Sequence, residues 1–277
     1  MTLRVRALTS EIGAEVSGVD LREPLDQAQH AALEQALLDH LVLFFRDQPL
    51  EPEQHLAFAQ RFGALDVHAF GRHLPELPAL GLLDQTEPER DGANRWHTDS
   101  TFMDRPPKAA MLRAVQLPDI GSDTCWASMY AAYEALSPPL QRMLEGLTAT
   151  HDLTGPLVRA IAGGHSISGL QEAQAAWPPR SHPVVCRHPD TGRRLLFVNS
   201  NFTTGIDGLA EAESETLLHF LFDHVRSPEF QVRFRWERDS VAFWDNRCTQ
   251  HYALADYRER RIMHRVTIAG DWAPRSD

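Results

Sequence analysis

The chain has 277 residues, of which 43% are hydrophobic, and its formal net charge is −11. This length and composition suffice to bury a full core, and we expect residues 1–277 to form a single domain. The acidic balance leaves no diffuse basic surface for a polyphosphate, which argues against nucleic acid as a partner and favours small molecules.

Three cysteines, Cys125, Cys186 and Cys248, follow no metal-binding spacing and are odd in number, which favours free thiols in a reducing compartment. The N-terminal stretch MTLRVRALTS lacks the apolar core of a signal peptide, and the apolar run LLDHLVLFF is too short to span a bilayer. We therefore expect a cytoplasmic protein without membrane contact. As a separate expectation, the chain assembles as a homo-oligomer, either a dimer or a tetramer.

Four helices are predicted from apolar periodicity and cap residues. They span residues 24–41, residues 52–62, a short stretch that has Ser137 as N-cap and ends near Gly146, and residues 211–225. We expect these helices to flank a sheet rather than to form a bundle, because clear strand patterns lie between them.

The clearest strand pattern is FQVRFRW. It places Phe230, Val232, Phe234 and Trp236 on one face and polar residues on the other, and a second strand pattern, VAFWDN, follows after a turn. The expected fold class is therefore mostly β with flanking helices.

The segment from Leu153 to Arg180 resists assignment, because it contains four glycines and ends in two prolines. Such a stretch is either an active-site lid that closes over a ligand or an ordinary surface loop. We carry residues 153–180 forward as a candidate lid.

Two His-x-Asp pairs occur in the chain. His188-Pro-Asp190 runs into Thr191-Gly192 and is typical of a turn. His97-Thr98-Asp99 lies instead in the β-branched and aromatic stretch WHTDSTF, which predicts a strand with His97 and Asp99 on the same face. This second pair is the candidate metal-binding pair.

Further along the chain stand His251 and, ten residues later, Arg261. Two imidazoles and one carboxylate on one side of an iron leave open positions for a chelating cosubstrate and dioxygen. In a strand, Arg261, Met263 and Arg265 share one face, so the two guanidinium groups can hold neighbouring anions in one pocket.

Five motifs then carry a family resemblance: WHTDSTF, GSDTCWAS, FVNSNFTT, WDNRCTQHYALADY and RRIMHR. In this order and spacing the chain resembles the Fe(II)- and 2-oxoglutarate-dependent dioxygenases of the TauD/TfdA family, and the taurine dioxygenase branch more than the herbicide-degrading branch. The resemblance begins at IGAEVSGVDL and continues to about Gly270.

The resemblance implies a distorted double-stranded β-helix, or jelly roll, wrapped by helices. It implies that His97, Asp99 and His251 bind Fe(II), and that Arg261 and Thr124 bind 2-oxoglutarate as cosubstrate. A planar guanidinium suits this role because it meets a carboxylate through two parallel charge-assisted hydrogen bonds.

For the primary substrate, the resemblance matches His68, Arg265 and the backbone N–H of Ser100 to the positions that hold a sulfonate, and Phe202 to an aromatic pocket wall. It thus implies a small anionic organosulfur substrate, taurine or another alkanesulfonate. Hydroxylation with O2 would release sulfite and an aldehyde, together with succinate and CO2.

The end of the pocket that would receive an amine departs from the family pattern. Gly71 replaces a tyrosine, Ala93 replaces an asparagine, and Gly155 replaces a lysine. Because a buried ammonium without partners is costly, an alkyl sulfate ester is an alternative substrate, and an aryloxyalkanoate is another within the same family.

Two functions of other classes remain open. A zinc hydrolase could use the same three ligands to activate water, but no candidate glutamate base lies beside WHTDSTF, and Arg261 and Thr124 would stay unexplained. A noncatalytic jelly-roll binding protein is the second alternative, and the intact set of metal ligands argues against it.

Overall fold

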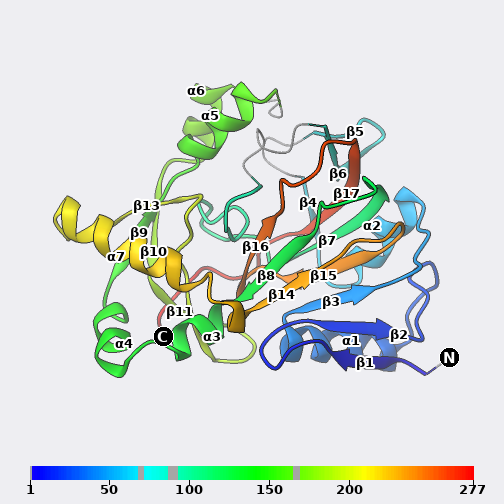
Figure 1. Cartoon of the computed structure of the whole chain (residues 1–277), viewed down its shortest axis with the longest axis horizontal. Helices are drawn as coiled ribbons and strands as arrows, with labels where there is room; N and C mark the ends of the chain where they lie inside the picture. The colour runs from blue at the N-terminus through cyan, green and yellow to red at the C-terminus, as the bar shows by residue number, and fades with distance from the viewer. Residues whose placement is uncertain (1, 68–71, 87–92, 165–168) are drawn as a thin grey trace.

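The computed structural model describes residues 2–67, 72–86, 93–164 and 169–277 (Figure 1). Within these ranges it has 17 strands and seven α-helices, and the helices lie on the outside of the sheets. None of the described helices is both long enough and apolar enough to span a membrane.

The larger sheet has nine strands, most of them antiparallel to their neighbours. In spatial order they are β1 (Arg4–Ala7), β2 (Ala14–Ser17), β3 (Val42–Phe45), β15 (Val241–Asp245), β7 (Ala109–Gln116), β17 (Arg261–Ile268), β6 (Leu77–Gln85) and β5 (His73–Leu74), with β4 (Leu65–Asp66) paired to β17.

β3 and β15 are buried on both faces, which explains why their sequences, VLFF and VAFW, are continuous apolar runs. On β15, Ala242 and Trp244 belong to one core cluster, whereas Val241 and Phe243 belong to another. The second cluster packs under the helices α1 (Gln27–His40) and α2 (Pro52–Gln60).

The first cluster fills the space between the larger sheet and a second, three-stranded sheet of β14 (Gln231–Phe234), β8 (Thr124–Ser128) and β16 (Thr249–Ala253). Phe44 of β3 stacks on Phe234 of β14, with ring centroids 4.1 Å apart. These two facing sheets form the expected double-stranded β-helix, so the predicted fold class is confirmed.

The apolar face predicted for FQVRFRW is also confirmed, although the strand itself is shorter than the pattern. Its four apolar side chains all lie in the first cluster: Phe230, Val232, Phe234 and Trp236. The remaining strands form two small sheets: β10 (Arg180–Pro183), β9 (Thr148–His151) and β13 (Thr203–Ile206) in one, and β11 (Val185–Arg187) and β12 (Arg194–Leu196) in the other.

The four predicted helices are all present. The last two of them are α4 (Pro138–Leu144) and α7 (Glu211–His224). Asp26 caps α1 by accepting a hydrogen bond from the backbone N–H of Gln29, and Pro52 occupies the first position of α2. Apolar periodicity and cap residues did not predict α3 (Met129–Glu134) or the 3-10 turn η2 (Pro228–Phe230).

The candidate lid contains two short helices that the sequence did not predict, α5 (Thr154–Ala162) and α6 (Leu170–Ala176). Figure 1 shows them together at one end of the molecule, away from the larger sheet. Leu157 and Ala173 from these helices are buried in a third apolar cluster with Phe102 and Phe202. Whether residues 153–180 act as a lid stays a prediction.

One buried histidine makes no contribution to the site. His55, on α2, is fully buried, and neither ring nitrogen has a hydrogen-bond partner among the described residues. Burial, together with the nearby charges of His264 and Arg113, lowers the pKa of His55 to about 3. The imidazole is therefore neutral in the folded protein at neutral pH.

Candidate metal centre and cosubstrate pocket

His97, Asp99 and His251 converge at one point between the two sheets, and each offers a ligand atom within 4.8 Å of the others. The Nε2 atoms of His97 and His251 lie 3.6 Å and 3.8 Å from Oδ1 of Asp99. All three side chains are buried. Residues that are far apart in sequence thus form one compact donor set.

Backbone pairing brings the two histidines together. His97 and His251 form an isolated antiparallel bridge, with N–H to carbonyl distances of 3.1 Å and 2.8 Å. Since His251 lies in the middle of β16, this bridge adds His97 to the edge of the second sheet. The ring centroids of the two imidazoles are then 4.2 Å apart.

The prediction that WHTDSTF forms a strand is wrong. Apart from the bridge at His97 the segment is not a strand, and a turn starts at Asp99. Ser100 has a φ of 50°, in the left-handed region, which bends the chain sharply. Side chains hold this turn instead of a strand ladder: Thr98 donates to the carbonyl of Thr249, and the amide oxygen of Asn246 accepts from the N–H of Asp99.

The donor set fits a divalent ion such as Fe(II). Atoms bound at about 2.1 Å to one ion lie from about 3 Å apart at right angles to about 4.2 Å on opposite sides, and both measured separations fall in this range. His97 donates from Nδ1 to the carbonyl of Arg95 at 2.7 Å, which leaves the Nε2 lone pair for a metal.

The electrostatics also suit metal binding. Burial, with His97 nearby, lowers the pKa of His251 to about 3, so this imidazole is neutral and can donate its lone pair. Burial by itself would raise the pKa of Asp99, but Arg265 and the two histidines outweigh it and hold that pKa well below its usual value. Asp99 is therefore an ionised carboxylate.

Arg265 donates a hydrogen bond of 2.5 Å to Oδ2 of Asp99, so Oδ1 is the oxygen that faces the two histidines. The Arg265 side chain also borders a small cavity of about 50 Å³ that reaches Asp66 and Thr267. The predicted substrate-binding arginine thus lies directly beside the donor set. Its contact with a substrate anion stays a prediction.

A cavity of about 90 Å³ opens beside the donor set. Its walls come from both sheets and are mainly apolar: Leu83, Gln85, Ala93, His97, Leu112, Thr124, Trp126, Trp244, His251, Ala253, Arg261 and Arg265. The structure thus brings both residues predicted for the cosubstrate, Arg261 and Thr124, into the same cavity as the two histidines. Arg261, the first residue of β17, is only 3% exposed, so its guanidinium does not point into bulk solvent.

Sequence reasoning did not identify the partner of Thr124. The indole Nε1 of Trp236 donates to Oγ1 of Thr124 at 2.9 Å, and both residues are buried. Because the oxygen already accepts this bond, the hydroxyl hydrogen is available for an acceptor inside the cavity. This arrangement suits a carboxylate of 2-oxoglutarate.

For the other residues predicted to bind the primary substrate, the structure shows the positions of Phe202 and Ser100 but not of His68. Phe202 is buried against Phe102, with ring centroids 5.2 Å apart, in the cluster that α5 and α6 cover. Ser100 is buried directly after Asp99. His68 and Gly71 lie outside the described residues, so their predicted places in the pocket stay predictions.

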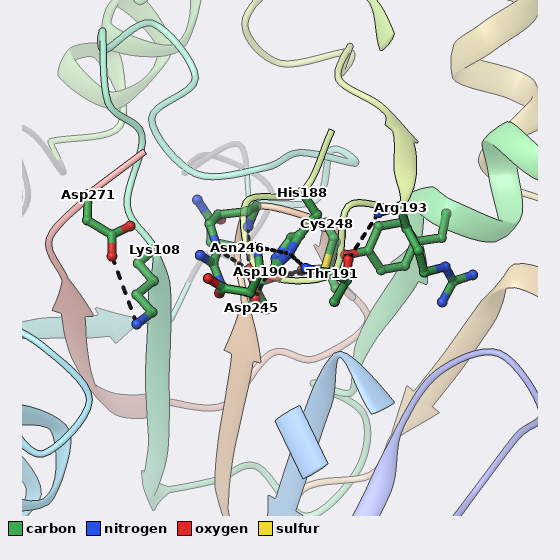
Figure 2. A network of polar contacts seen from close by, with 12 residues as sticks. Lys108, His188, Asp190, Thr191, Arg193, Asp245, Asn246, Cys248 and Asp271 are labelled. Atoms are coloured by element: carbon green, nitrogen blue, oxygen red, sulfur yellow. Dashed lines mark hydrogen bonds and ion pairs between the residues drawn. The ribbon is translucent and has the colours of Figure 1, made fainter. Parts of the chain in front are cut away.

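A second group of potential ligands, His188, Asp245 and Cys248, is a structural network (Figure 2). Nε2 of His188 lies 3.0 Å from Oδ2 of Asp245, and Arg247 donates to both carboxylate oxygens at 3.0 Å and 2.7 Å. With both oxygens already engaged, and with the pKa of the Cys248 thiol raised by burial, the group lacks free metal ligands.

This network anchors the start of β16. The hydroxyl of Thr249 donates to the carbonyl of Asp245 at 2.7 Å, and Arg247 also binds Asp190 at 2.8 Å. The turn predicted for His188-Pro-Asp190 is confirmed, since the N–H of Gly192 donates to the carbonyl of His188. The motif WDNR therefore positions the strand that carries His251.

Comparison with known proteins agrees with this site. Residues 4–267 match the family model described as "Taurine catabolism dioxygenase TauD, TfdA family". A taurine dioxygenase from Burkholderia xenovorans has a similar solved structure, with a TM-score of 0.84 and 38% sequence identity over 98% of this chain and 92% of that one.

Two curated relatives carry names that refer to sulfate esters. An alpha-ketoglutarate-dependent sulfate ester dioxygenase from Pseudomonas putida is 38% identical over 98% of this chain and 91% of its own. An alkylsulfatase from Acinetobacter baylyi is 37% identical over 97% of this chain and 86% of its own.

Proposed function

The chain belongs to the TauD/TfdA family of Fe(II)- and 2-oxoglutarate-dependent dioxygenases, and on that premise we propose that it hydroxylates a small organosulfur anion at the carbon that carries the sulfur oxyanion group. The observation that carries this proposal is the donor set of His97, Asp99 and His251 with two arginines, Arg261 and Arg265, lining the cavity beside it. We assign Arg261 to 2-oxoglutarate and Arg265 to the substrate anion.

Bound iron and 2-oxoglutarate would supply the oxidant, with one oxygen atom of O2 ending in succinate as CO2 is released and the other in the hydroxyl group of the product. The chain itself holds and aims the reactants. Arg261 and Thr124 fix the distal carboxylate, whereas Arg265 holds the substrate anion beside Asp99, so that the adjacent C–H bond faces the metal.

An alkyl sulfate ester fits the described residues better than taurine does. Hydroxylation of its oxygen-bearing carbon gives a hemiacetal sulfate, which collapses to an aldehyde and sulfate. Phe202, the predicted pocket wall, lies in an apolar cluster with Phe102, Leu153 and Leu157. Ala93 and Gly155 replace the asparagine and the lysine of the family pattern, so these two positions offer no polar side chain to an ammonium, whose burial without partners would be costly.

The names of the two curated relatives also support the sulfate ester. Taurine or another alkanesulfonate remains the second candidate, since the solved structure named as a taurine dioxygenase is equally similar in sequence. The cytoplasmic location and the homo-oligomeric state stay predictions.

The test is substrate-dependent succinate formation by purified protein with Fe(II), 2-oxoglutarate and O2. We expect alkyl sulfates to stimulate succinate formation most, alkanesulfonates less, and taurine least. A zinc hydrolase would instead release sulfate without O2, and a noncatalytic binding protein would form no succinate at all. A marked preference for aryloxyacetates would contradict the assigned substrate class.

A further inference from the structure

A larger cavity, of about 550 Å³, lies beside the segments that carry the two histidines. It is lined by Asn94, Arg95, Trp96, Arg159, Ser200, Arg226 and Tyr252. Trp96 directly precedes His97 in sequence, and Tyr252 directly follows His251. Neighbouring side chains in extended backbone point to opposite sides, so these two rings point away from the metal centre. The two aromatic rings pack together with centroids 5.6 Å apart. We call this space the outer cavity.

The outer cavity collects positive charge in a chain whose net charge is −11. Three of its lining residues are arginines, and none of the described lining residues is acidic. Within the described part of the chain, Arg226 pairs with the exposed carboxylate of Asp223, and Arg95 has no ion pair. Among the described residues, three cations therefore line one space against a single exposed carboxylate.

Arg159 gives a second and independent indication of a missing partner. Its terminal nitrogen donates to Asn201 at 2.5 Å, but its Nε is buried and has no acceptor among the described residues. Such an unsatisfied donor is costly unless a ligand supplies the acceptor. Burial, and then the like charge of Arg95, lowers the pKa of Arg159, which indicates that the two guanidinium groups lie close together.

We propose that the outer cavity binds a small tetrahedral oxyanion, a phosphate or sulfate group, and that the bound anion ties helix α5 to the body of the protein. Guanidinium groups bind such oxyanions through paired, charge-assisted hydrogen bonds. The three arginines come from separate parts of the chain: Arg159 lies on α5, Arg226 follows α7, and Arg95 precedes the His97 bridge. One anion shared among them links these parts.

The anion has two sources that share this chemistry. It is either a free inorganic ion, including sulfate released by the proposed reaction, or the charged group of an organic monoester. The cavity volume leaves room for an organic group beyond the anion, and the Trp96 and Tyr252 rings offer it an aromatic wall. The binding itself does not depend on the proposed primary substrate.

Calorimetric titration tests the site on protein loaded with Mn(II) and 2-oxoglutarate, so that the metal centre and Arg261 are occupied and no turnover occurs. Any binding of the probe at Arg265 would be the same in the wild type and in variants of the outer cavity. Inorganic phosphate and phenyl phosphate are the probes, with inorganic sulfate as a comparison. We expect one site, weakened about tenfold or more in both Arg159→Gln and Arg226→Gln. The matched control, exposed Arg142→Gln on α4, should bind as the wild type does.

The outcomes are separable. Tighter binding of phenyl phosphate identifies a monoester as the ligand, whereas equal affinities identify the free ion. Absence of binding, or equal affinity in the wild type and in Arg226→Gln, overturns the proposal. Because Arg226 is exposed, its replacement should leave the fold intact. No turnover is measured, so failure of the proposed reaction would not produce these results.

Hydrogen–deuterium exchange tests the link to α5. Phosphate should slow amide exchange in residues 154–162 of the wild type and leave it unchanged in Arg226→Gln. Phosphate binding without any change in this helix would overturn the proposed link.

Discussion

Replacing Trp236 by Phe tests how the cosubstrate pocket orients Thr124. The indole N–H donates to Oγ1 of Thr124 at 2.9 Å, which leaves the hydroxyl hydrogen to donate to an acceptor in the cavity. Phenylalanine keeps an aromatic ring in the core but removes this donor. The hydroxyl then loses its fixed orientation and binds the distal carboxylate of 2-oxoglutarate less well.

The expected loss follows from one neutral hydrogen bond. A net value of about 0.5–1.5 kcal/mol corresponds to an affinity about 2- to 12-fold weaker for 2-oxoglutarate. Thr124→Val removes the bond to the carboxylate itself, which is charge-assisted, so its loss should be larger, at about 10-fold or more. In the Thr124→Val background, Trp236→Phe should then have no further effect.

The assay is anaerobic titration of the Fe(II) protein with 2-oxoglutarate, followed by its visible charge-transfer band. Trp272→Phe is the matched control, because Trp272 is as buried as Trp236, its Nε1 has no partner among the described residues, and it does not line the cavity. Equal affinities for Trp236→Phe and Trp272→Phe, or additive losses in the double variant, would refute this account of Thr124.

Three further predictions concern stability and the two arginines. Asp245→Asn should lower the free energy of unfolding, measured by urea denaturation, by about 3 kcal/mol, because Arg247 would stay buried without its main counter-charge. A loss of less than about 1 kcal/mol would contradict this prediction. The unfolded chain protonates His55 near pH 6.5 but the folded protein only near pH 3, so stability falls as pH drops through this window. His55→Leu should flatten that dependence by about 1.4 kcal/mol per pH unit, and an unchanged slope would argue against a neutral buried imidazole. Arg261→Gln should weaken 2-oxoglutarate binding about 10-fold or more and leave the affinity for Mn(II) unchanged. Arg265→Gln should mainly raise the KM of the primary substrate. The reverse pattern would exchange the two assignments.

Local patterns predicted much of the fold. Cap residues and apolar periodicity predicted α1, α2, α4 and α7. Asp26 caps α1, a proline begins α2 and α4, and two glutamates lie in the first turn of α7. The helices α5 and α6 escaped prediction because their glycines suggested a loop. Tertiary packing of Leu157 and Ala173 stabilises them instead, and short-range sequence patterns carry no signal for such contacts.

The site was predictable only in part. His-x-Asp is a weak local signal, and the family motifs alone joined His251 to His97, because the bridge between them depends on the folded sheet. The WHTDSTF segment has strand-forming residues, yet the contacts of Asn246 and the left-handed Ser100 impose a turn. The bond from Trp236 to Thr124 likewise joins two strand ends that no sequence pattern relates.

A crystal structure of the protein with Mn(II) and the 2-oxoglutarate analogue N-oxalylglycine tests the central claim most directly. We predict one anomalous scattering peak bound by His97, Asp99 and His251, with the distal carboxylate of the analogue held by Arg261 and Thr124. Metal bound at another place, or an analogue whose carboxylate lies away from Arg261, would contradict the proposed site.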